Sequence, residues 1–486
     1  MALYISSHPQ MSLNTPSKFR LLHTCTTPAS ISQVGDSSKM ANLRSSSLLF
    51  LPFLSFFILS IVAQAQVPAA QQFRWVNQGP MADYVTEFGA TYRPPSIAGF
   101  SKFPFSLCFY NTTPDAHVFA IRMGSRRGEN IMRWVWDANR NSPVRENSTL
   151  AFGRNGNLVL ANADGRVVWQ TNTANKGVTG FQLLPTGNLV LHDRTGRFVW
   201  QSFDHPTDTL LVGQSLRLAG VSKLVSRTSD ENGSDGPYSA AISPKGFLTH
   251  FTSAGVALPY GGWLQNYQMD AVTLAIEPDV VEGQTVAYFL SLTFQSNVSN
   301  SDTFELVRIY YNSTFSFLRI SSDGNLRTFT YNDKVVEGAW LPTFSFFAGD
   351  FDTFPFYSFG YDRRCGLPGK CGSFGLCQEG MCVACPQPRG MLGWSQSCAP
   401  PKLSSSCKAG AANYYKIDRV EHFVSRNVEG EGPMKETECR EKCSKDCKCV
   451  GFFYWRETSR CWLAPVLGTL RKVEESSHVG YVKVSQ

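Results

Sequence analysis

The distribution of cysteine restricts the folding of this chain more than any other feature of its sequence. Twelve of its 14 cysteines fall in the last quarter, as two sets of six. The sets are Cys365, Cys371, Cys377, Cys382, Cys385 and Cys398, then Cys407, Cys439, Cys443, Cys447, Cys449 and Cys461. Neither segment has enough apolar residues to fold on a hydrophobic core alone. Each set therefore predicts a small disulfide-stabilised module in an oxidising compartment.

Zinc binding and redox catalysis are the alternatives for these cysteines. Cys382-x-x-Cys385 and the group Cys443, Cys447 and Cys449 contain spacings that are similar to those of zinc ligands. Disulfides are favoured because secreted cysteines oxidise and because no histidine completes a ligand set. No βαβ pattern surrounds the C-x-x-C pair, which argues against thioredoxin-like chemistry. We expect neither a metal nor a cofactor.

Cys108 lies far from the other cysteines, in a segment where phenylalanines and other residues alternate between Phe103 and Tyr110. This period of two predicts a strand in which Cys108 points away from the phenylalanine face. A buried free thiol is favoured over an intermolecular bridge. Cys25 lies in a part of the chain that we expect to be removed.

The N-terminal region predicts secretion. A basic stretch at Met40–Arg44 precedes an apolar run over 48–63 and a small-x-small cleavage pattern ending at Ala65, so residues 40–65 are typical of a signal peptide. A membrane anchor is the alternative, but Pro52, Ser55 and Ser60 interrupt this run, and no other segment approaches the roughly 20 apolar residues that span a bilayer. Residues 1–39 have the composition of a transit peptide or of an untranslated or unstructured extension upstream of Met40.

Glycosylation signals and charge agree with an extracellular protein. The chain has 45 basic and 38 acidic residues, but the basic ones are scattered, so a nucleic acid is not an expected partner. Five N-x-Ser/Thr sequons predict N-glycans in a secreted protein: Asn111, Asn147, Asn232, Asn297 and Asn312. We expect an apoplastic or cell-wall location with no membrane anchor.

Two sequence landmarks recur 31 residues apart. Gly-Asn-Leu-Val-Leu stands at 156–160 and again at 187–191, and Val-Trp-Gln followed by Thr or Ser stands at 168–171 and 199–202. A shared offset predicts a repeated antiparallel unit that contributes one tryptophan per copy to a common core. A weaker echo at Phe317–Leu326 suggests a second, diverged copy of the whole domain.

These residues carry a resemblance to a known family. Trp136–Arg140, the Gly-Asn-Leu-Val-Leu repeat and the block Trp200–Leu211 resemble the bulb-type lectin domain of plant S-locus glycoproteins. Because the chain ends at Gln486 without a kinase, it is most similar in form to the epidermis-specific secreted glycoproteins. The resemblance implies an all-β dominated protein with four parts: a β-prism II lectin domain over 66–215, a diverged lectin-like β domain over 216–345, an EGF-like module over 361–400 and an α+β PAN/apple module over 405–486.

The PAN/apple resemblance also implies disulfide pairs. From the residues alone, the segment 434–445 predicts a helix that places Cys439 and Cys443 on one face. The family pattern implies two pairs, and elimination suggests a third: Cys439–Cys461, Cys443–Cys449 and Cys407–Cys447. The pairing within the first set of six stays open.

A mannose site is implied by the bulb-lectin resemblance, with the pattern Q-x-D-x-N-x-V-x-Y. The first repeat keeps Asn157 and Val159, with Asn155 in place of the acid, and the second keeps Asn188 and Val190. Turn chemistry accounts equally for Asn157 and Asn188 as hairpin residues, so a purely structural role is the alternative. The late echo keeps the acid and the asparagine but has an arginine at the valine position: Ser321, Asp323, Asn325, Arg327 and Phe329.

No catalytic motif stands out in the sequence. His205 lies close to Asp204 and Asp208, which could form an acid/base pair, but Pro206 and its polar neighbours predict an ordinary turn. Motifs for zinc proteases, nucleophile elbows, phosphate loops and calcium loops are missing from the sequence. A glycosidase carboxylate pair is a remote alternative. We therefore expect a protein that is not an enzyme.

The expected function follows from these observations. We expect a secreted glycoprotein that binds carbohydrate, with a mannose-type glycan as the candidate, or a cell-surface or wall protein, through its lectin-like and PAN modules. The alternative is a structural or receptor-associated protein whose sugar sites have decayed and which acts by protein–protein contact.

Overall fold

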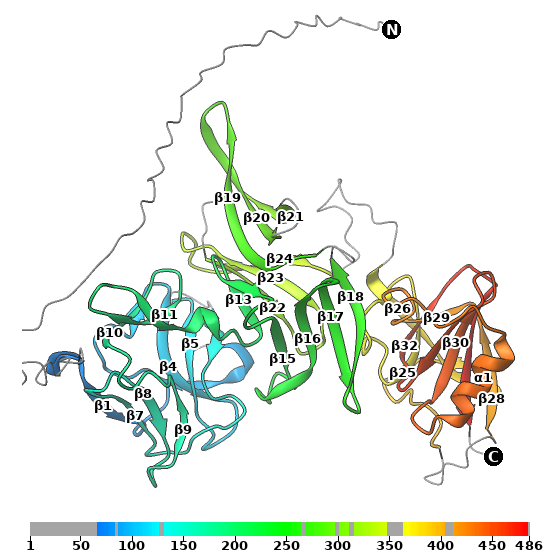
Figure 1. The fold of residues 1–486 in the computed structure, drawn as a ribbon, viewed down its shortest axis with the longest axis horizontal. Coiled ribbons are helices and arrows are strands. Elements are labelled where there is room, and N and C mark those ends of the chain that lie inside the picture. The colour runs from blue at the N-terminus through cyan, green and yellow to red at the C-terminus, as the bar shows by residue number, and fades with distance from the viewer. Residues whose placement is uncertain are drawn as a thin grey trace, which may run out of the picture. The chain divides into compact units, whose positions relative to one another are not determined.

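The computed structural model describes residues 66–82, 86–125, 131–263, 268–296, 301–310, 315–347, 363–403 and 412–484 (Figure 1). The predicted extension and signal peptide, Cys25, Cys407, Asn297 and Asn312 lie outside these ranges. Within them, no helix has the length and apolar character needed to cross a membrane.

Three antiparallel sheets form the first lectin-like domain, which we call the first prism (strands β1–β12). One sheet has the order β1-β7-β8-β9: Phe73–Val76, Thr149–Phe152, Leu158–Ala161 and Val167–Gln170. A second has the order β10-β11-β12: Val178–Leu183, Leu189–Asp193 and Phe198–Gln201. The third has the order β2-β4-β5-β6, with β3 beside β4: Thr91–Arg93, Phe105–Asn111, Val118–Met123, Arg133–Asp137 and, for β3, Ser101–Lys102.

A tryptophan from each sheet meets the other two in the centre of the first prism. The rings of Trp136, Trp169 and Trp200 lie edge to face, with centroids 5.9 to 6.2 Å apart. Such contacts between aromatic rings add to the free energy gained by burying their apolar surface. The prediction that each repeat contributes a tryptophan to a shared core is confirmed.

Three further four-stranded sheets form the second prism (strands β13–β24), in the region where a second β domain was predicted. The first has the order β13-β22-β23-β24: Thr209–Leu211, Ser316–Ile320, Leu326–Tyr331 and Trp340–Ser345. The second has the order β14-β19-β20-β21: Ser215–Arg217, Ala271–Val281, Gln284–Gln295 and Asp302–Ile309. The third has the order β15-β16-β17-β18: Lys223–Arg227, Asp235–Ser243, Gly246–Ser253 and Val256–Trp263.

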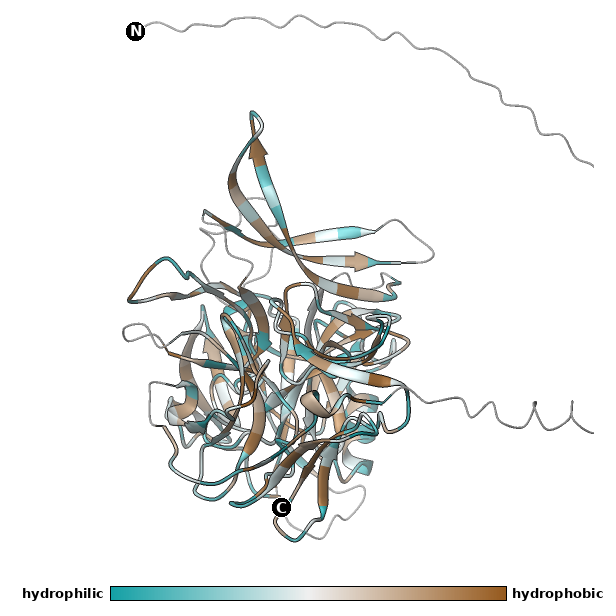
Figure 2. Cartoon of the chain, turned by 90° about the vertical axis from the view of Figure 1, so that its left-hand side faces the viewer, coloured by the Kyte–Doolittle hydropathy of each residue, from teal (hydrophilic) through white to brown (hydrophobic). Residues whose placement is uncertain are grey.

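The second prism begins earlier than the expected boundary after residue 215. Strand β13 pairs with β22 through Leu210 and Leu318, so the end of the Trp200–Leu211 block already belongs to the second prism. The β19–β20 hairpin extends beyond the other strands of its sheet (Figures 1 and 2). Val280 and Val281 at its tip are about half exposed, at 54% and 51%.

The two cysteine-rich segments share one sheet. Strand β25 (Phe374–Gln378) pairs in parallel with β32 (Gly468–Lys472), although about a hundred residues separate them. This sheet has the order β27-β26-β25-β32-β29, in which the other strands are Gly390–Gly393, Met381–Gln387 and Val420–His422. A second sheet has the order β28-β33-β30-β31: Asn413–Asp418, His478–Val484, Gly451–Trp455 and Arg460–Ala464.

The predicted helix and disulfides of the C-terminal module are present. Helix α1 spans Glu436–Lys445, two residues shorter at its start than predicted. The implied pairs Cys439–Cys461 and Cys443–Cys449 form, and Cys447 is also disulfide-bonded. In the first set the pairs, left open by the sequence, are Cys365–Cys377, Cys371–Cys382 and Cys385–Cys398.

Cys108 is a buried free thiol, as predicted. It lies on β4 and packs with Tyr92, Tyr110 and Trp134, on the side of the strand opposite Phe109. Burial raises the pKa of the Cys108 thiol to about 12, so the unreactive neutral form persists at physiological pH.

Candidate functional site

The repeat asparagines of the first prism hold its hairpins together. Asn157 donates from Nδ2 to Gln170 Oε1, and Asn188 donates to Gln201 Oε1, both at 2.8 Å. Their Oδ1 atoms accept from backbone N–H groups in the loop after the third strand of each unit, at 3.0 and 3.2 Å. Both side chains are buried, at 7% and 4% exposure. Their hydrogen-bonding atoms therefore stabilise the turns rather than facing solvent.

The remaining predicted sugar-site residues are divided between surface and core. Asn155 is exposed and accepts from the Asn157 backbone N–H at 3.1 Å, while Val159 is half-buried. Val190 is fully buried among the core strands. The first repeat therefore keeps Asn155 and part of Val159 accessible to a ligand, whereas the second repeat keeps neither of its predicted residues accessible.

The late echo has the same turn in the second prism. Asn325 donates from Nδ2 to Ser345 Oγ at 2.9 Å and accepts from the Phe347 backbone N–H at 3.1 Å. The glycine before the asparagine has a positive φ in all three turns: +78° at 156, +83° at 187 and +86° at 324. Only glycine adopts this conformation at no steric cost, which explains the Gly-Asn pair in each turn.

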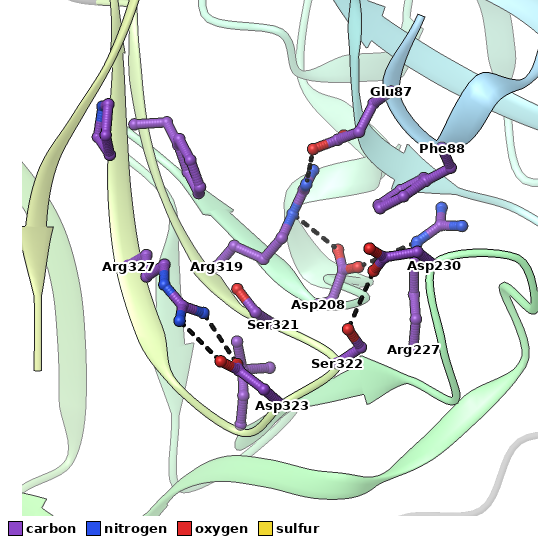
Figure 3. A pocket seen from close by; sticks show the side chains of 13 residues that line it. Glu87, Phe88, Asp208, Arg227, Asp230, Arg319, Ser321, Ser322, Asp323 and Arg327 are labelled. Atoms are coloured by element: carbon purple, nitrogen blue, oxygen red, sulfur yellow. Dashed lines mark hydrogen bonds and ion pairs between the residues drawn. The ribbon is translucent and has the colours of Figure 1, made fainter. Parts of the chain in front are cut away.

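The late echo differs from the two first-prism turns in its surroundings, because its residues other than Asn325 line a pocket. Four of the five echo residues, namely Ser321, Asp323, Arg327 and Phe329, border a cavity of about 540 Å³. This volume lies within the range of roughly 300–1,000 Å³ that is usual for small-ligand sites. Figure 3 shows Ser321, Asp323 and Arg327 at the β22–β23 hairpin, across the pocket from Glu87 and Phe88 of the first prism. The pocket therefore lies between the two prisms.

The rim of the pocket is held by hydrogen bonds between its own side chains. Arg327 donates to both oxygens of Asp323, at 2.8 and 2.7 Å, and Ser322 Oγ donates to Asp230 Oδ1 at 3.0 Å (Figure 3). Asp230 belongs to the loop between β15 and β16. A bidentate pair fixes the planes of both groups, so the rim is organised before any ligand arrives.

Glu87, in a short 3₁₀ turn (Glu87–Gly89), anchors the first-prism wall. Its Oε1 accepts from Arg319 Nη1 at 2.7 Å and from Arg133 Nη1 at 2.6 Å. Burial acts to raise the pKa of Glu87, but the Arg319 and Arg133 guanidiniums outweigh it and hold the pKa below its ordinary value. The ion pair joins the two prisms, because Glu87 belongs to the first prism and Arg319, 232 residues later, lies on β22 of the second.

Asp208 is the second anchor and comes from the Trp200–Leu211 block. Its carboxylate lies 3.4 Å from Arg227 Nε, 3.8 Å from Arg140 Nη1 and 3.9 Å from Arg319 Nε. Burial acts to raise the pKa of Asp208, and the three guanidiniums together lower it. Arg140 ends the Trp136–Arg140 block, so the two most distinctive sequence blocks meet at the junction between the prisms.

Arg227, the last residue of β15 in the second prism, extends this network to residues of the first prism. Its Nη2 donates to Tyr110 OH at 2.5 Å and to Asp137 Oδ2 at 3.1 Å, and its guanidinium lies 4.5 Å from the Phe88 ring centroid. Arg227 is 3% exposed, and its Nη1 has no hydrogen-bond partner among the residues that the structure describes. Arg227 also lines the pocket.

His205 packs against an aromatic side chain of the first prism. Its ring stacks on Trp200 with centroids 5.3 Å apart, and its backbone oxygen accepts from Trp136 Nε1 at 2.9 Å. Asp204 accepts from Gln201 and Asp208 lies in the junction. These contacts fit the predicted polar turn.

Sequence reasoning did not identify Glu87, Phe88, Asp230 and Arg227 as site residues. No motif surrounds them, and they reach the pocket only because distant segments pack together. The one available signal was the retained acid of the late echo, Asp323, which does lie in the pocket.

Comparisons with known proteins identify the family. Residues 133–229 match the D-mannose binding lectin family. EP1-like glycoprotein 2 of Arabidopsis thaliana is 51% identical over 454 residues, covering 88% of this chain and 97% of the relative. The epidermis-specific secreted glycoprotein EP1 of Daucus carota is 47% identical over 383 residues, covering 76% of this chain and 97% of the relative.

More distant relatives carry a kinase name. A G-type lectin S-receptor-like serine/threonine-protein kinase of Arabidopsis thaliana is 26% identical over 374 residues, which cover 72% of this chain but only 39% of the kinase. The likeness to the kinases is thus distant and partial. With its bulb-type lectin domain, its second prism and its disulfide-rich C-terminal region, the chain belongs to the family of EP1-like glycoproteins.

Proposed function

We propose that this protein is a secreted, non-catalytic glycoprotein of the apoplast or cell wall that binds a neutral oligosaccharide in the pocket between its two prisms. The observation that carries the proposal is the position of the late echo. Ser321, Asp323 and Arg327 stand where the family pattern places sugar-binding residues, and they line the pocket. The name of one relative, the epidermis-specific secreted glycoprotein EP1, supports a secreted glycoprotein, and the match of residues 133–229 to the D-mannose binding lectin family supports sugar binding.

The chemistry of the pocket suits a polyhydroxylated ligand. Carboxylates accept from sugar hydroxyls and guanidiniums donate to them, while the half-buried rings of Phe88 and Phe329 offer apolar surface for the C–H face of a sugar. Positive and negative side chains nearly balance, which favours a neutral ligand over a charged one: Arg227, Arg319 and Arg327 against Glu87, Asp208, Asp230 and Asp323.

A glycan array with the mature, glycosylated protein tests the proposal. The matched pair of variants is Arg327→Ala, in the pocket, and Arg197→Ala, whose ion pair with Asp193 has the same i,i+4 spacing on a first-prism hairpin. We expect Arg327→Ala to weaken binding about tenfold or more and Arg197→Ala to bind as the wild type does. Equal binding by both variants would place the sugar elsewhere.

A second function is favoured by the condition of the first-prism repeats. Asn157 and Asn188 are committed to turns and Val190 is buried, as expected for sugar sites that have decayed. The alternative proposal is a structural or receptor-associated protein that acts by protein–protein contact. An array without any glycan signal, together with capture of a cell-surface or wall protein by the intact chain, would support this alternative.

A further inference from the structure

The loop between β15 and β16, residues 228–234, contains both a residue that lines the pocket and a sequon for N-glycosylation. Asp230 lines the pocket, and Asn232 opens the sequon Asn232-Gly-Ser234 two residues later. Asn232 is exposed, and its carboxamide oxygen accepts from the Ser234 backbone N–H and hydroxyl at 3.1 and 2.8 Å. The turn thus uses the oxygen, whereas an N-glycan attaches through the nitrogen.

Contacts on both sides hold this loop in place. Thr112 Oγ1 of the first prism donates to the Glu231 carbonyl at 2.7 Å, and Ser322 Oγ of the second prism donates to Asp230 Oδ1 at 3.0 Å. Within the loop, Ser229 Oγ accepts from the Asn232 backbone N–H at 3.1 Å. Because the loop is fixed to both prisms, the attachment point of a glycan on Asn232 is fixed beside the pocket.

Chain geometry sets how far that attachment point can lie from the pocket. Two peptide units place the Cα atoms of Asp230 and Asn232 no more than about 7.6 Å apart. A saccharide tethered over so short a distance has an effective concentration of about 1 mM. A free saccharide with a Kd of about 0.1 mM would then bind about tenfold more weakly than it would to an empty pocket.

We propose that the N-glycan on Asn232 occupies the pocket between the prisms in cis and limits the access of free saccharides to it. This inference rests on the proposed function, because it requires that the pocket recognise sugar. It adds a regulatory element: the extent of glycosylation at one asparagine sets the apparent affinity of the site. The other exposed sequon asparagine of the described chain, Asn147, lies in a turn before β7 that contributes no residue to the pocket.

The test uses the full chain expressed in plant cells, with occupancy of each sequon measured by mass spectrometry of glycopeptides. The probe is the oligosaccharide released from the wild-type protein's own N-glycans, titrated by calorimetry. Two variants remove the glycan at Asn232 by different changes, Asn232→Gln and Ser234→Ala. Asn147→Gln removes a glycan elsewhere, and Arg327→Ala in the Asn232→Gln background removes a pocket contact.

We expect both Asn232→Gln and Ser234→Ala to bind the probe about tenfold more tightly than the wild type and Asn147→Gln do. Adding Arg327→Ala should abolish this gain. An unmodified Asn232 in the wild-type protein, or equal affinities for wild type and Asn232→Gln with loss on Arg327→Ala, would overturn occupancy in cis and leave the pocket as a sugar site. Absence of binding by every variant, the deglycosylated ones included, would also overturn occupancy in cis, and a glycan array without any signal on the same variants would overturn the proposed function itself.

Discussion

The hairpins of the first prism and the β22–β23 hairpin of the second prism share one turn but have different surroundings. Asn157, Asn188 and Asn325 make equivalent pairs of hydrogen bonds from equivalent positions. The first two turns close sheets of the first prism, whereas the third faces Glu87 and Phe88 across the junction and lines a pocket. The comparison teaches that this repeat encodes a turn, and that the turn lines a pocket where a second domain faces it.

The largest effect on the free energy of unfolding is expected from removing the carboxylate of Asp208, which contacts arginines of both prisms. Asp208→Ala leaves Arg140, Arg227 and Arg319 without a common buried anion, which should lower the free energy of unfolding by about 3–5 kcal/mol. Urea unfolding followed by tryptophan fluorescence measures this change. If Asp208→Ala does not fold, Asp208→Asn keeps the shape and should still destabilise. A wild-type midpoint for Asp208→Asn would contradict the role of this anion.

A smaller and nearly equal effect is expected from the shared asparagines. Asn157→Ala and Asn325→Ala each remove the same two kinds of hydrogen bond from a buried turn, so each should cost about 1–3 kcal/mol. Thermal unfolding of both variants checks this. If Asn325→Ala cost much less than Asn157→Ala, the two turns would not be equivalent and the comparison would fail.

Acid should weaken the junction selectively. The pKa values of Glu87 and Asp208 lie below their ordinary values of 4.5 and 3.8, so their stabilisation is complete above those values and is lost as the pH falls through the folded-state values. The pKa of Asp137 is shifted in the opposite direction, because burial raises it. The contribution of Asp137 to stability therefore changes with pH in the opposite sense. Glu87→Gln should therefore lose less stability than the wild type as the pH falls below 4. Urea midpoints between pH 2 and pH 6 measure it, and parallel acid limbs for variant and wild type would contradict it.

The smallest effect is expected on the stability of the rim. Asp323 and Arg327 form a partly exposed pair, so Arg327→Ala should lower the free energy of unfolding by less than about 1 kcal/mol. Arg197 is largely exposed, and its replacement should leave the melting temperature unchanged. Differential scanning calorimetry of both variants checks this. A large loss with Arg327→Ala would mean that weaker sugar binding reflects unfolding rather than a lost contact.

Local patterns predicted the fold of this protein well. The 31-residue offset indicated repeated sheets that share a tryptophan core, because each sheet exposes an apolar face that only its neighbours can bury. The cysteine sets indicated disulfide modules, and the helix spacing placed Cys439 and Cys443 on one face. Sequence did not predict that β25 and β32 join the two modules into one sheet, since a parallel pairing between distant strands leaves no local pattern.

The candidate site was only partly predictable. The residues of the β22–β23 turn were visible as an echo of a family pattern, because spacing along one hairpin is a property of the sequence. Whether such a turn lines a pocket depends on which residues face it. Asp323 lies in a pocket because Glu87, Phe88 and Asp230 form other parts of its wall.

The sequence by itself determined the turns, the strand repeats and the supply of cysteines, since each depends on residues that are near one another in the chain. Only the tertiary structure decided that Asp208, Arg227 and Arg319 would share one buried network and leave a pocket beside it. The physical reason is that the cost of burying a charge is offset only when its partner is in place, and here the partners lie in different domains.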